Sequence, residues 1–225
     1  MKRRGVYKRK DGRWEARYQK GIGENGRAIY GAVYGATEEE VVEKRRLLVG
    51  DNEESAKLPM ELNLLILGAG THGRDVKEIA ESLHIFNKIS FLDDKIESEG
   101  IIGTCKNILQ FRNEYPCAFI AIGDNKVRKR YSKLLEDYKF LIPKIVSPAA
   151  NISPVARVGK GTVVLPQATV GDAEVGEFCI LASNSLVNSG STVKDFTHID
   201  CGGIVLKGTK VPEGTEVKSG EIYDA

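Results

Sequence analysis

The sequence predicts an α/β plus β protein built in three parts, and three observations support this prediction. Hairpin turn signals and a capped helix fill the first part, a buried strand with a glycine-rich turn opens the second, and a six-residue aliphatic repeat runs through the third. The expected parts are a three-stranded sheet plus helix over residues 1–57, a small parallel-sheet domain over 62–146 and a parallel β-helix over 147–225.

Two turn signals and a helix start define the first part. Asp11-Gly12 and Asn25-Gly26 are dipeptides typical of tight hairpin turns, so three strands are expected around them. Thr37 and Glu40 stand at the spacing of a capping box and predict a helix that ends near Gly50.

The first part is strongly basic. Residues 1–31 carry ten Lys or Arg against three acidic residues, although the net charge of the whole chain is only +2. A β-ribbon with exposed basic side chains can neutralise phosphates, and its arginines can reach the base edges of DNA. The alternative is a solvated basic hairpin that aids folding or attachment. The residues expected to contact DNA are Lys8, Lys10, Arg13, Arg17 and Arg27.

The stretch 5–17, followed by the Thr-Glu-Glu-Glu helix start at Thr37, resembles the arm-type, AP2-like DNA-binding domain of phage and transposon integrases. The resemblance is confined to the first part and implies that the three-stranded sheet lies in the major groove. No integrase catalytic domain follows, so the present task of this part is left open.

A strand, a glycine turn and a helix open the second part, which is expected to be Rossmann-like. The apolar run 62–67 leads through the turn 68–73 into a helical pattern that starts near Asp75. Glycines permit a tight turn and let a phosphate or ribose approach the N–H groups at the helix start. The next strand ends at Asp93-Asp94, where an acidic side chain can accept hydrogen bonds from a ribose or base.

Three interpretations of this glycine turn stay open. NAD fits the residue pattern, but the chain before the β-helix is about half of a full dinucleotide fold, which favours a mononucleotide portion. A packing turn without a ligand is the third interpretation. A further buried strand over 118–122 ends in Gly123-Asp124-Asn125 and leads into a helix that holds Arg128.

An aliphatic residue recurs every six positions through the last third of the chain, with one five-residue step between Val170 and Val175. A helix would repeat near 3.6 residues and an ordinary strand every two, so neither fits. Short fixed repeats are typical of a parallel β-helix, in which each coil makes three short strands and stacks the repeated aliphatics inside. Twelve positions predict about four coils; they are Ile152, Val158, Val164, Val170, Val175, Leu181, Val187, Val193, Ile199, Val205, Val211 and Val217.

Four signals occur in one order: the turn 67–74, the strand end 91–94, the segment 121–125 with Arg128, and the hexapeptide β-helix. Over residues 62–218 they resemble the bacterial sugar acyltransferases of the sialic acid O-acetyltransferase and bacillosamine N-acetyltransferase family. The resemblance implies a left-handed β-helix and a homotrimer packed through its β-helices. It also implies a nucleotide sugar, such as a UDP-amino sugar, on the small domain and acetyl-CoA in a groove between neighbouring β-helices.

The same resemblance implies roles for individual residues, and the match is uneven. In the family a β-helix histidine is the general base, but its Val-Glu-His-Asp segment reads Val-Asn-Ser-Gly over residues 187–190 here. Ser189 therefore stands at the position of the base, and a serine cannot remove a proton unaided at neutral pH. His198 is either the replacement base or a cap of one coil, and His72 is the next candidate. The nucleotide-side positions that match are Gly68, Gly70, His72, Gly73, Asp94, Gly123 and Asn125.

Two functions of different classes follow. The first is acetyl-CoA-dependent acyl transfer to a nucleotide-linked sugar for surface polysaccharide or glycan synthesis, weakened by Ser189. The second is a non-catalytic nucleotide-sugar-binding trimer that binds DNA through its N-terminal domain.

Composition argues against other classes. A β-helix carbonic anhydrase needs three histidines for zinc, whereas the β-helix here contains only His198. The four cysteines lack CxxC spacing, so free thiols and no metal are expected. No run approaches twenty apolar residues, and the basic start lacks the apolar stretch of a signal peptide. A cytoplasmic protein without a membrane span is therefore expected.

Overall fold

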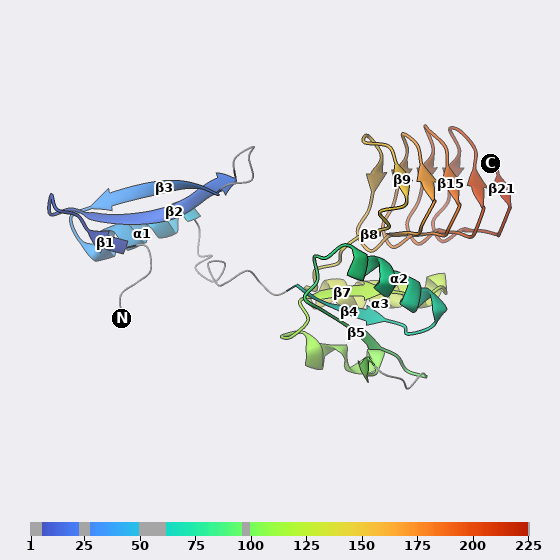
Figure 1. Ribbon diagram of the computed structural model, residues 1–225, viewed down its shortest axis with the longest axis horizontal. Helices are drawn as coiled ribbons and strands as arrows, with labels where there is room; N and C mark the ends of the chain where they lie inside the picture. Colours follow the sequence, from blue (N-terminus) through green and yellow to red (C-terminus); the bar gives the residue numbers. More distant parts are fainter. Residues whose placement is uncertain (1–5, 23–27, 50–61, 96–99, 225) are drawn as a thin grey trace. The chain divides into compact units, whose positions relative to one another are not determined.

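The computed structural model describes residues 6–22, 28–49, 62–95 and 100–224. The chain divides into two compact units, Met1–Met60 and Glu61–Ala225, and each is described by itself (Figure 1). Among the helices in the described ranges, none has the length and apolar character needed to cross a membrane.

The first unit is an antiparallel sheet in the order β1-β2-β3, followed by helix α1. Gly12 adopts φ +86° in the turn between β1 and β2, as its place in the Asp-Gly signal predicts. The second turn signal, Asn25-Gly26, lies outside the described residues. The elements are β1 (Val6–Lys8), β2 (Trp14–Ile22), β3 (Ala28–Gly35) and α1 (Glu38–Val49).

The predicted cap of α1 is confirmed, with one difference. The Glu40 N–H donates to Thr37 Oγ1 at 3.1 Å, as a capping box requires. The Glu40 carboxylate reaches back one residue further than expected and accepts from the Ala36 N–H at 2.7 Å. The N–H groups of Ala36 and Glu40, at the start of the helix, therefore both have hydrogen-bond acceptors.

Helix α1 covers one face of this sheet. Ala16 and Val41 are fully buried, and Trp14 lies opposite Gly35 in the register of β2 and β3. A Cβ added to Gly35 would lie 2.9 Å from the Val41 side chain, so helix and strand are in close contact there. Because side chains alternate along a strand, Arg13, Glu15 and Arg17 point to the opposite face.

The second unit begins with a parallel sheet in the order β6-β5-β4-β7. All five residues of the central strand β4 are buried, because helices cover both faces of the sheet. Helix α2 packs on one face, and α3 with a 3₁₀ helix packs on the other. The bounds are β4 (Asn63–Leu67), α2 (Thr71–Ser82), β5 (Lys88–Leu92), β6 (Ile101–Gly103), the 3₁₀ helix (Cys105–Phe111), β7 (Cys117–Ile120) and α3 (Asn125–Asp137).

Two-residue strands then stack into three parallel sheets, which form the sides of a coil (Figure 1). The orders are β10-β13-β16-β19, β20-β17-β14-β11-β8 and β21-β18-β15-β12-β9. The strands are β8 (Ile145–Val146), β9 (Asn151–Ile152), β10 (Arg157–Val158), β11 (Val163–Val164), β12 (Thr169–Val170), β13 (Glu174–Val175), β14 (Ile180–Leu181), β15 (Leu186–Val187), β16 (Thr192–Val193), β17 (His198–Ile199), β18 (Ile204–Val205), β19 (Lys210–Val211), β20 (Glu216–Val217) and β21 (Ile222–Tyr223).

The aliphatic repeat forms the interior of this stack, as predicted. Ten of the twelve positions are buried in one cluster, and Ile152 and Val158, in the first coil, pack against it partly buried. Because of the five-residue step, one coil of the β-helix is one residue shorter than the coil that follows it. Arg157 pairs with Glu174 before the step, and Glu174 pairs with Thr192 after it.

The outer side of one sheet of the stack is covered by the small parallel-sheet part. Ile145, Val163 and Ile180, on β8, β11 and β14, share a buried cluster with Val76 and Ile79 of α2. The next strand of this sheet, β17, carries His198, which is near enough to His72 at the start of α2 to act on it electrostatically.

Candidate functional site

The three glycines of the turn after β4 differ in their surroundings. Gly68 has φ +103°, and a Cβ there would lie 2.6 Å from the Ala121 carbonyl oxygen. A Cβ on Gly73 would lie 2.0 Å from the Gly68 carbonyl oxygen. A Cβ on Gly70, the residue before α2, would meet nothing within 4 Å. Gly68 and Gly73 thus permit close packing, whereas Gly70 leaves open space beside the N–H groups that begin α2.

The two acidic residues after β5 have separate partners. Asp93 Oδ2 accepts from the Ala69 N–H at 2.8 Å, which fixes the glycine turn. Asp94 Oδ1 accepts from the Cys105 N–H at 2.9 Å and so holds the start of the 3₁₀ helix. The residue that contacts the turn is therefore Asp93, next to the Asp94 singled out from the sequence.

His72, in the first turn of α2, is a largely buried neutral imidazole. Its Nε2 atom is buried without a hydrogen-bond partner among the described residues. Burial lowers the pKa of His72 to about 4, with smaller contributions from the charges of His198 and Arg128. A base with so low a pKa is weak at neutral pH, but its ring nitrogen can bind a ligand by a hydrogen bond.

His198, on β17, is better suited to remove a proton. Its side chain is partly buried and lies in register between Ile180 of β14 and Glu216 of β20. Burial lowers its pKa, and the Arg128 charge adds to this effect, while the carboxylates of Asp200 and Glu216 oppose it. A neutral imidazole with two carboxylates nearby can accept a proton and stabilise the resulting cation.

Ser189 lies on a different corner of the coil. It is exposed in the turn between β15 and β16, and its Oγ accepts from the Asp172 N–H at 3.1 Å. A Cβ on Gly171 would lie 2.6 Å from this Oγ, so the hydroxyl fills the space between successive turns. Within one chain, the structure brings His72 near His198, whereas Ser189 lies between β15 and β16, which belong to the other two sheets of the coil.

A pocket of about 470 Å³ lies where the start of α3 meets the β-helix. Asn125, a predicted ligand residue, donates from Nδ2 to the Gly214 carbonyl at 2.9 Å and so ties the two sides together. A Cβ on Gly123 would meet nothing within 4 Å, so this glycine faces the open part of the pocket. Its lining residues are Gly123, Asp124, Asn125, Lys126 and Lys129 on one side, and Phe196, Glu213, Gly214 and Glu216 on the other.

Arg128 is a residue of this junction to which no sequence pattern gives a site role. Its side chain is fully buried and contacts both sides of this junction. An arginine on the first turn of a helix is usually exposed, so no local pattern distinguishes it.

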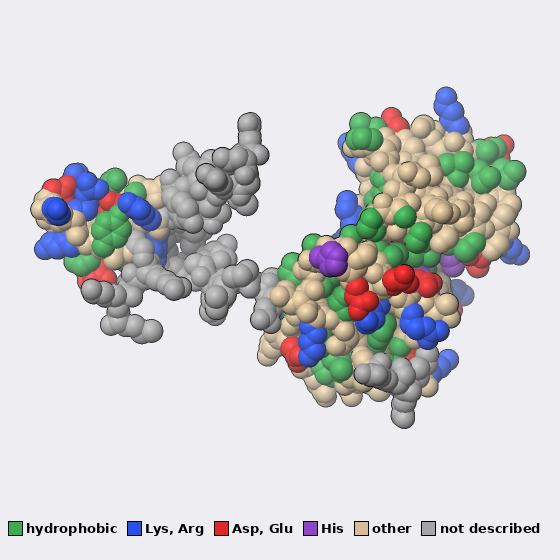
Figure 2. Space-filling model, in the orientation of Figure 1, with side chains coloured by type: hydrophobic (Ala, Val, Ile, Leu, Met, Phe, Trp, Pro, Cys, Tyr) green, Lys and Arg blue, Asp and Glu red, His purple; other side chains and the backbone are tan. Residues whose placement is uncertain are grey.

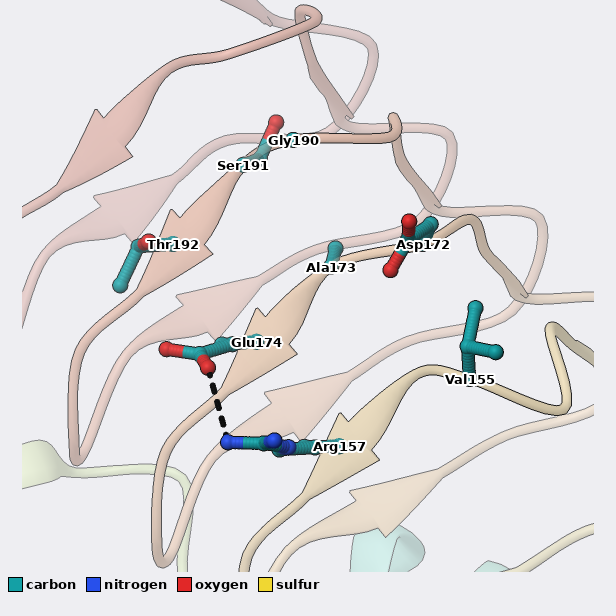
Figure 3. Close-up of a pocket in the computed structure, with 8 residues that line it drawn as sticks. All are labelled: Val155, Arg157, Asp172, Ala173, Glu174, Gly190, Ser191 and Thr192. Carbon is teal, nitrogen blue, oxygen red and sulfur yellow. Dashed lines mark hydrogen bonds and ion pairs between the residues drawn. The ribbon is translucent and has the colours of Figure 1, made fainter.

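A second pocket, of about 460 Å³, lies on the outer face of β10, β13 and β16, beside the turn that holds Ser189 (Figure 3). Arg157 and Glu174 form an ion pair across its floor at 3.3 Å. Val155 is 64% exposed at its edge. The lining residues are Val155, Arg157, Asp172, Ala173, Glu174, Gly190, Ser191 and Thr192.

The described ranges contain no group of three His, Cys, Asp or Glu side chains placed to hold a metal ion. Cys105, Cys117 and Cys179 are buried free thiols, and Cys201 is exposed. Burial raises the pKa of Cys105 and Cys179 to about 12, so both stay protonated.

Basic and acidic side chains lie close together on the N-terminal unit (Figure 2), and on the open face of its sheet arginines and tyrosines surround Glu15. Arg9 and Arg17 pair with Glu15, which also accepts from the Tyr7 hydroxyl, and these bonds lower the pKa of Glu15 to about 2. Arg13 pairs with Asp11 at 2.8 Å. Each of these arginines therefore forms an ion pair with a carboxylate, which partly neutralises its positive charge.

The residues predicted to contact DNA are only partly gathered on this face. Arg13 and Arg17 lie on it, and Lys10 lies in the adjoining turn. Lys8 pairs with Trp14 in the register and so belongs to the face of α1. Arg27 lies outside the described residues. Arg9 was not among the residues predicted to contact DNA, but it lies on the open face where Lys8 was expected. Its guanidinium lies 5.3 Å from the centre of the Tyr34 ring.

Taken together, the second unit joins a strand–glycine turn–helix to a coil that presents a histidine. Residues 63–135 match the family described as the PglD N-terminal domain. The chain is 30% identical over 110 residues to UDP-N-acetylbacillosamine N-acetyltransferase of Bacillus subtilis strain 168, a match that covers 46% of this chain and 51% of the relative. The matched part thus spans about half the length of that curated relative.

Solved structures extend the likeness to the β-helix. The acetyltransferase domain of PglB from Neisseria gonorrhoeae in complex with acetyl coenzyme A is similar with a TM-score of 0.67 and 28% identity, over 72% of this chain and 82% of that one. PerB from Caulobacter crescentus, in complex with CoA and GDP-perosamine, shares the fold with a TM-score of 0.56 and 22% identity, over 72% of this chain and 91% of that one.

Proposed function

We propose that the chain is an acetyl-CoA-dependent acyltransferase that acts on a nucleotide-linked amino or deoxy sugar for surface polysaccharide or glycan synthesis. The observation that carries the proposal is His198, a neutral imidazole at the junction between the glycine-turn domain and the β-helix. The relatives named above support it, because they are sugar N-acetyltransferases or are solved with acetyl-CoA or CoA. The proposal includes a left-handed coil and a homotrimer, whose neighbouring copies would close the groove for the acyl donor.

The chemistry assigned to the chain is one acyl transfer. The sugar amine or hydroxyl attacks the thioester carbonyl carbon, and His198 accepts the proton from that nucleophile. The C–S bond breaks, a C–N or C–O bond forms, and the CoA thiolate takes the proton back from the imidazolium. His72 and the space at Gly70 are assigned to binding the nucleotide sugar, since Nε2 of His72 is buried without a partner among the described residues.

We expect slow turnover, because Ser189 stands where the related acyltransferases have a histidine as general base. Positioned general bases contribute about 10²- to 10⁴-fold in rate, and a serine hydroxyl held by the Asp172 N–H does not supply one. If His198 is the base, His198→Ala should abolish turnover while nucleotide-sugar binding persists, and Ser189→Ala should change turnover little. If the site lacks a base, Ser189→His should raise turnover.

The test is the release of CoA thiol from acetyl-CoA in the presence of a panel of UDP-amino sugars and related nucleotide sugars. Mass spectrometry of the acetylated product identifies the acceptor. Absence of product with every acceptor, at enzyme concentrations that give calorimetric binding, would leave the chain a nucleotide-sugar binder without transferase activity.

A second candidate function is DNA binding through the N-terminal unit, and the observation that favours it is the open face with Arg9, Arg13 and Arg17. Arg13→Ala and Arg17→Ala should weaken binding of a labelled duplex, measured by fluorescence anisotropy, and lower its salt dependence. Lys8→Ala is the matched control, since Lys8 lies on the face of α1. Equal losses in all three variants, or no binding at low salt, would remove this candidate.

A further inference from the structure

Arg128 uses every hydrogen-bond donor that its guanidinium has. An arginine side chain has five N–H donors in a fixed plane. Arg128 lies in the first turn of α3 and is fully buried between this helix and the β-helix. Its acceptors are Phe178 O (2.7 Å from Nε), Ile122 O and Gly123 O (2.9 and 2.8 Å from Nη1), and Asn125 Oδ1 and Phe196 O (2.6 and 3.0 Å from Nη2).

None of these five acceptors is a carboxylate. The buried positive charge is therefore solvated by carbonyl dipoles alone, and burial lowers the pKa of Arg128 to about 10. The Asp124 carboxylate opposes that shift. A buried charge without an ionic partner is costly, and fold stability alone is better served by an apolar side chain of similar size.

The acceptors come from both sides of the candidate site. Ile122, Gly123 and Asn125 form the turn at the start of α3, which lines the junction pocket. Phe178 and Phe196 belong to successive coils, their rings stack 5.3 Å apart, and Phe196 precedes His198 by two residues. One rigid side chain therefore connects the pocket turn of the small domain to the strand that carries His198.

We propose that Arg128 is a positioning residue that fixes the distance between a ligand held by the small domain and the imidazole of His198. The role rests on the proposed acyltransferase function. Lysine cannot replace arginine here, because three donors on a flexible stem do not reproduce the planar set of five.

Turnover is the first readout. Arg128→Lys keeps a positive charge but loses the planar contacts, so kcat should fall roughly 100-fold, as a misplacement of about 1 Å does, with a smaller change in KM. Asn125→Ala is the milder variant, since it removes one acceptor, and it should lower kcat less than Arg128→Lys. Lys133→Met is the matched control: it removes an exposed cation on α3 that does not line the junction pocket, and it should leave kcat unchanged.

Histidine titration by NMR is the second readout and needs no turnover. The chain has three histidines, so their ring resonances are few, and His84 lies beyond the far end of α2 from His72. The charged groups that act on His72 are His198 and Arg128. Those that act on His198 are Arg128 from α3 and Asp200 and Glu216 from the β-helix. Arg128→Met should raise the pKa of both His72 and His198, whereas Arg128→Lys should raise neither.

The outcomes separate the two proposals. Unchanged pKa values in a folded Arg128→Met protein, or full turnover in Arg128→Lys, would overturn the role of Arg128. If wild type has no turnover but the titrations behave as expected, the acyltransferase proposal fails and Arg128 still sets the environment of the two histidines. If Arg128→Met does not fold, the kcat values of Arg128→Lys and Asn125→Ala test the role of Arg128 instead.

Discussion

At the scale of single residues, three glycines in one turn have different tasks. A side chain on Gly68 or Gly73 would collide with backbone atoms, whereas a side chain on Gly70 would project into open space. Gly70→Val should therefore reduce nucleotide-sugar affinity by about tenfold or more, which corresponds to about 1.4 kcal/mol, without changing the unfolding midpoint. Isothermal titration calorimetry with a UDP-amino sugar measures the affinity.

Gly73→Ala provides the contrast, because its Cβ would lie 2.0 Å from the Gly68 carbonyl oxygen and should destabilise the fold itself. Equal affinity in wild type and Gly70→Val would reject the turn as the ligand site. NAD binding in place of the nucleotide sugar would favour the dinucleotide interpretation.

The lowered pKa of His72 predicts that the free energy of unfolding depends on pH. Its folded pKa of about 4 lies below the unfolded value of about 6.5, so the unfolded chain binds more protons between these limits. The contribution to the free energy of unfolding is complete above about pH 6.5 and is lost as the pH falls to about 4, by on the order of 3 kcal/mol.

Denaturant unfolding at several pH values in that range measures the effect, and His72→Asn isolates it from the other acidic groups. The variant should show a shallower fall of the unfolding free energy than wild type. Parallel curves for the two proteins would show that His72 titrates normally in the fold.

The residue scale is also where the sequence was least informative. The strand–glycine–helix pattern indicates a binding turn, but it does not say that Asp93 rather than Asp94 contacts Ala69, since that depends on how β5 ends against β4. Arg128 acts through contacts with Phe178 and Phe196, which are distant in sequence. Such contacts follow from packing and not from local pattern.

At the scale of the elements, the β-helix depends on its stacked interior. Ile199 is fully buried there, whereas Ile222 is 61% exposed on the last strand. Ile199→Ala should lower the free energy of unfolding by about 2–5 kcal/mol, and Ile222→Ala by much less. Chemical denaturation of the two variants makes the comparison, and similar losses for both would contradict the inward orientation of the repeat.

Elements were predicted well where periodicity is strong. Every position of the six-residue repeat is the second residue of a short strand, because only that residue points inward in each two-residue strand. The cap of α1 followed equally from Thr37 and Glu40. The face to which Lys8 belongs could not be predicted, because it depends on the register of β1 against β2.

At the scale of the whole molecule, we predict a homotrimer with contacts along the β-helix. The outer face of β10, β13 and β16 carries an open pocket and the exposed Val155, which a neighbouring coil would cover. Light scattering at micromolar concentration should give three times the chain mass of 24.7 kDa. A stable monomer under these conditions, with Val155→Lys having no effect on mass, would disprove this assembly.

The number of six-residue repeats that precede a residue decides on which side of the coil that residue lies. Successive strands β15, β16 and β17 belong to the three different sheets, so inserting one repeat before His198 would move it to another side of the coil, away from α2. Inserting a whole coil would restore the side but displace the histidine along the axis. Substitutions can alter the histidine neighbourhood gradually, whereas the insertion or deletion of a whole repeat before β17 changes it in one step. Sequence drift in the coil is therefore expected to preserve the number of repeats more strictly than residue identity.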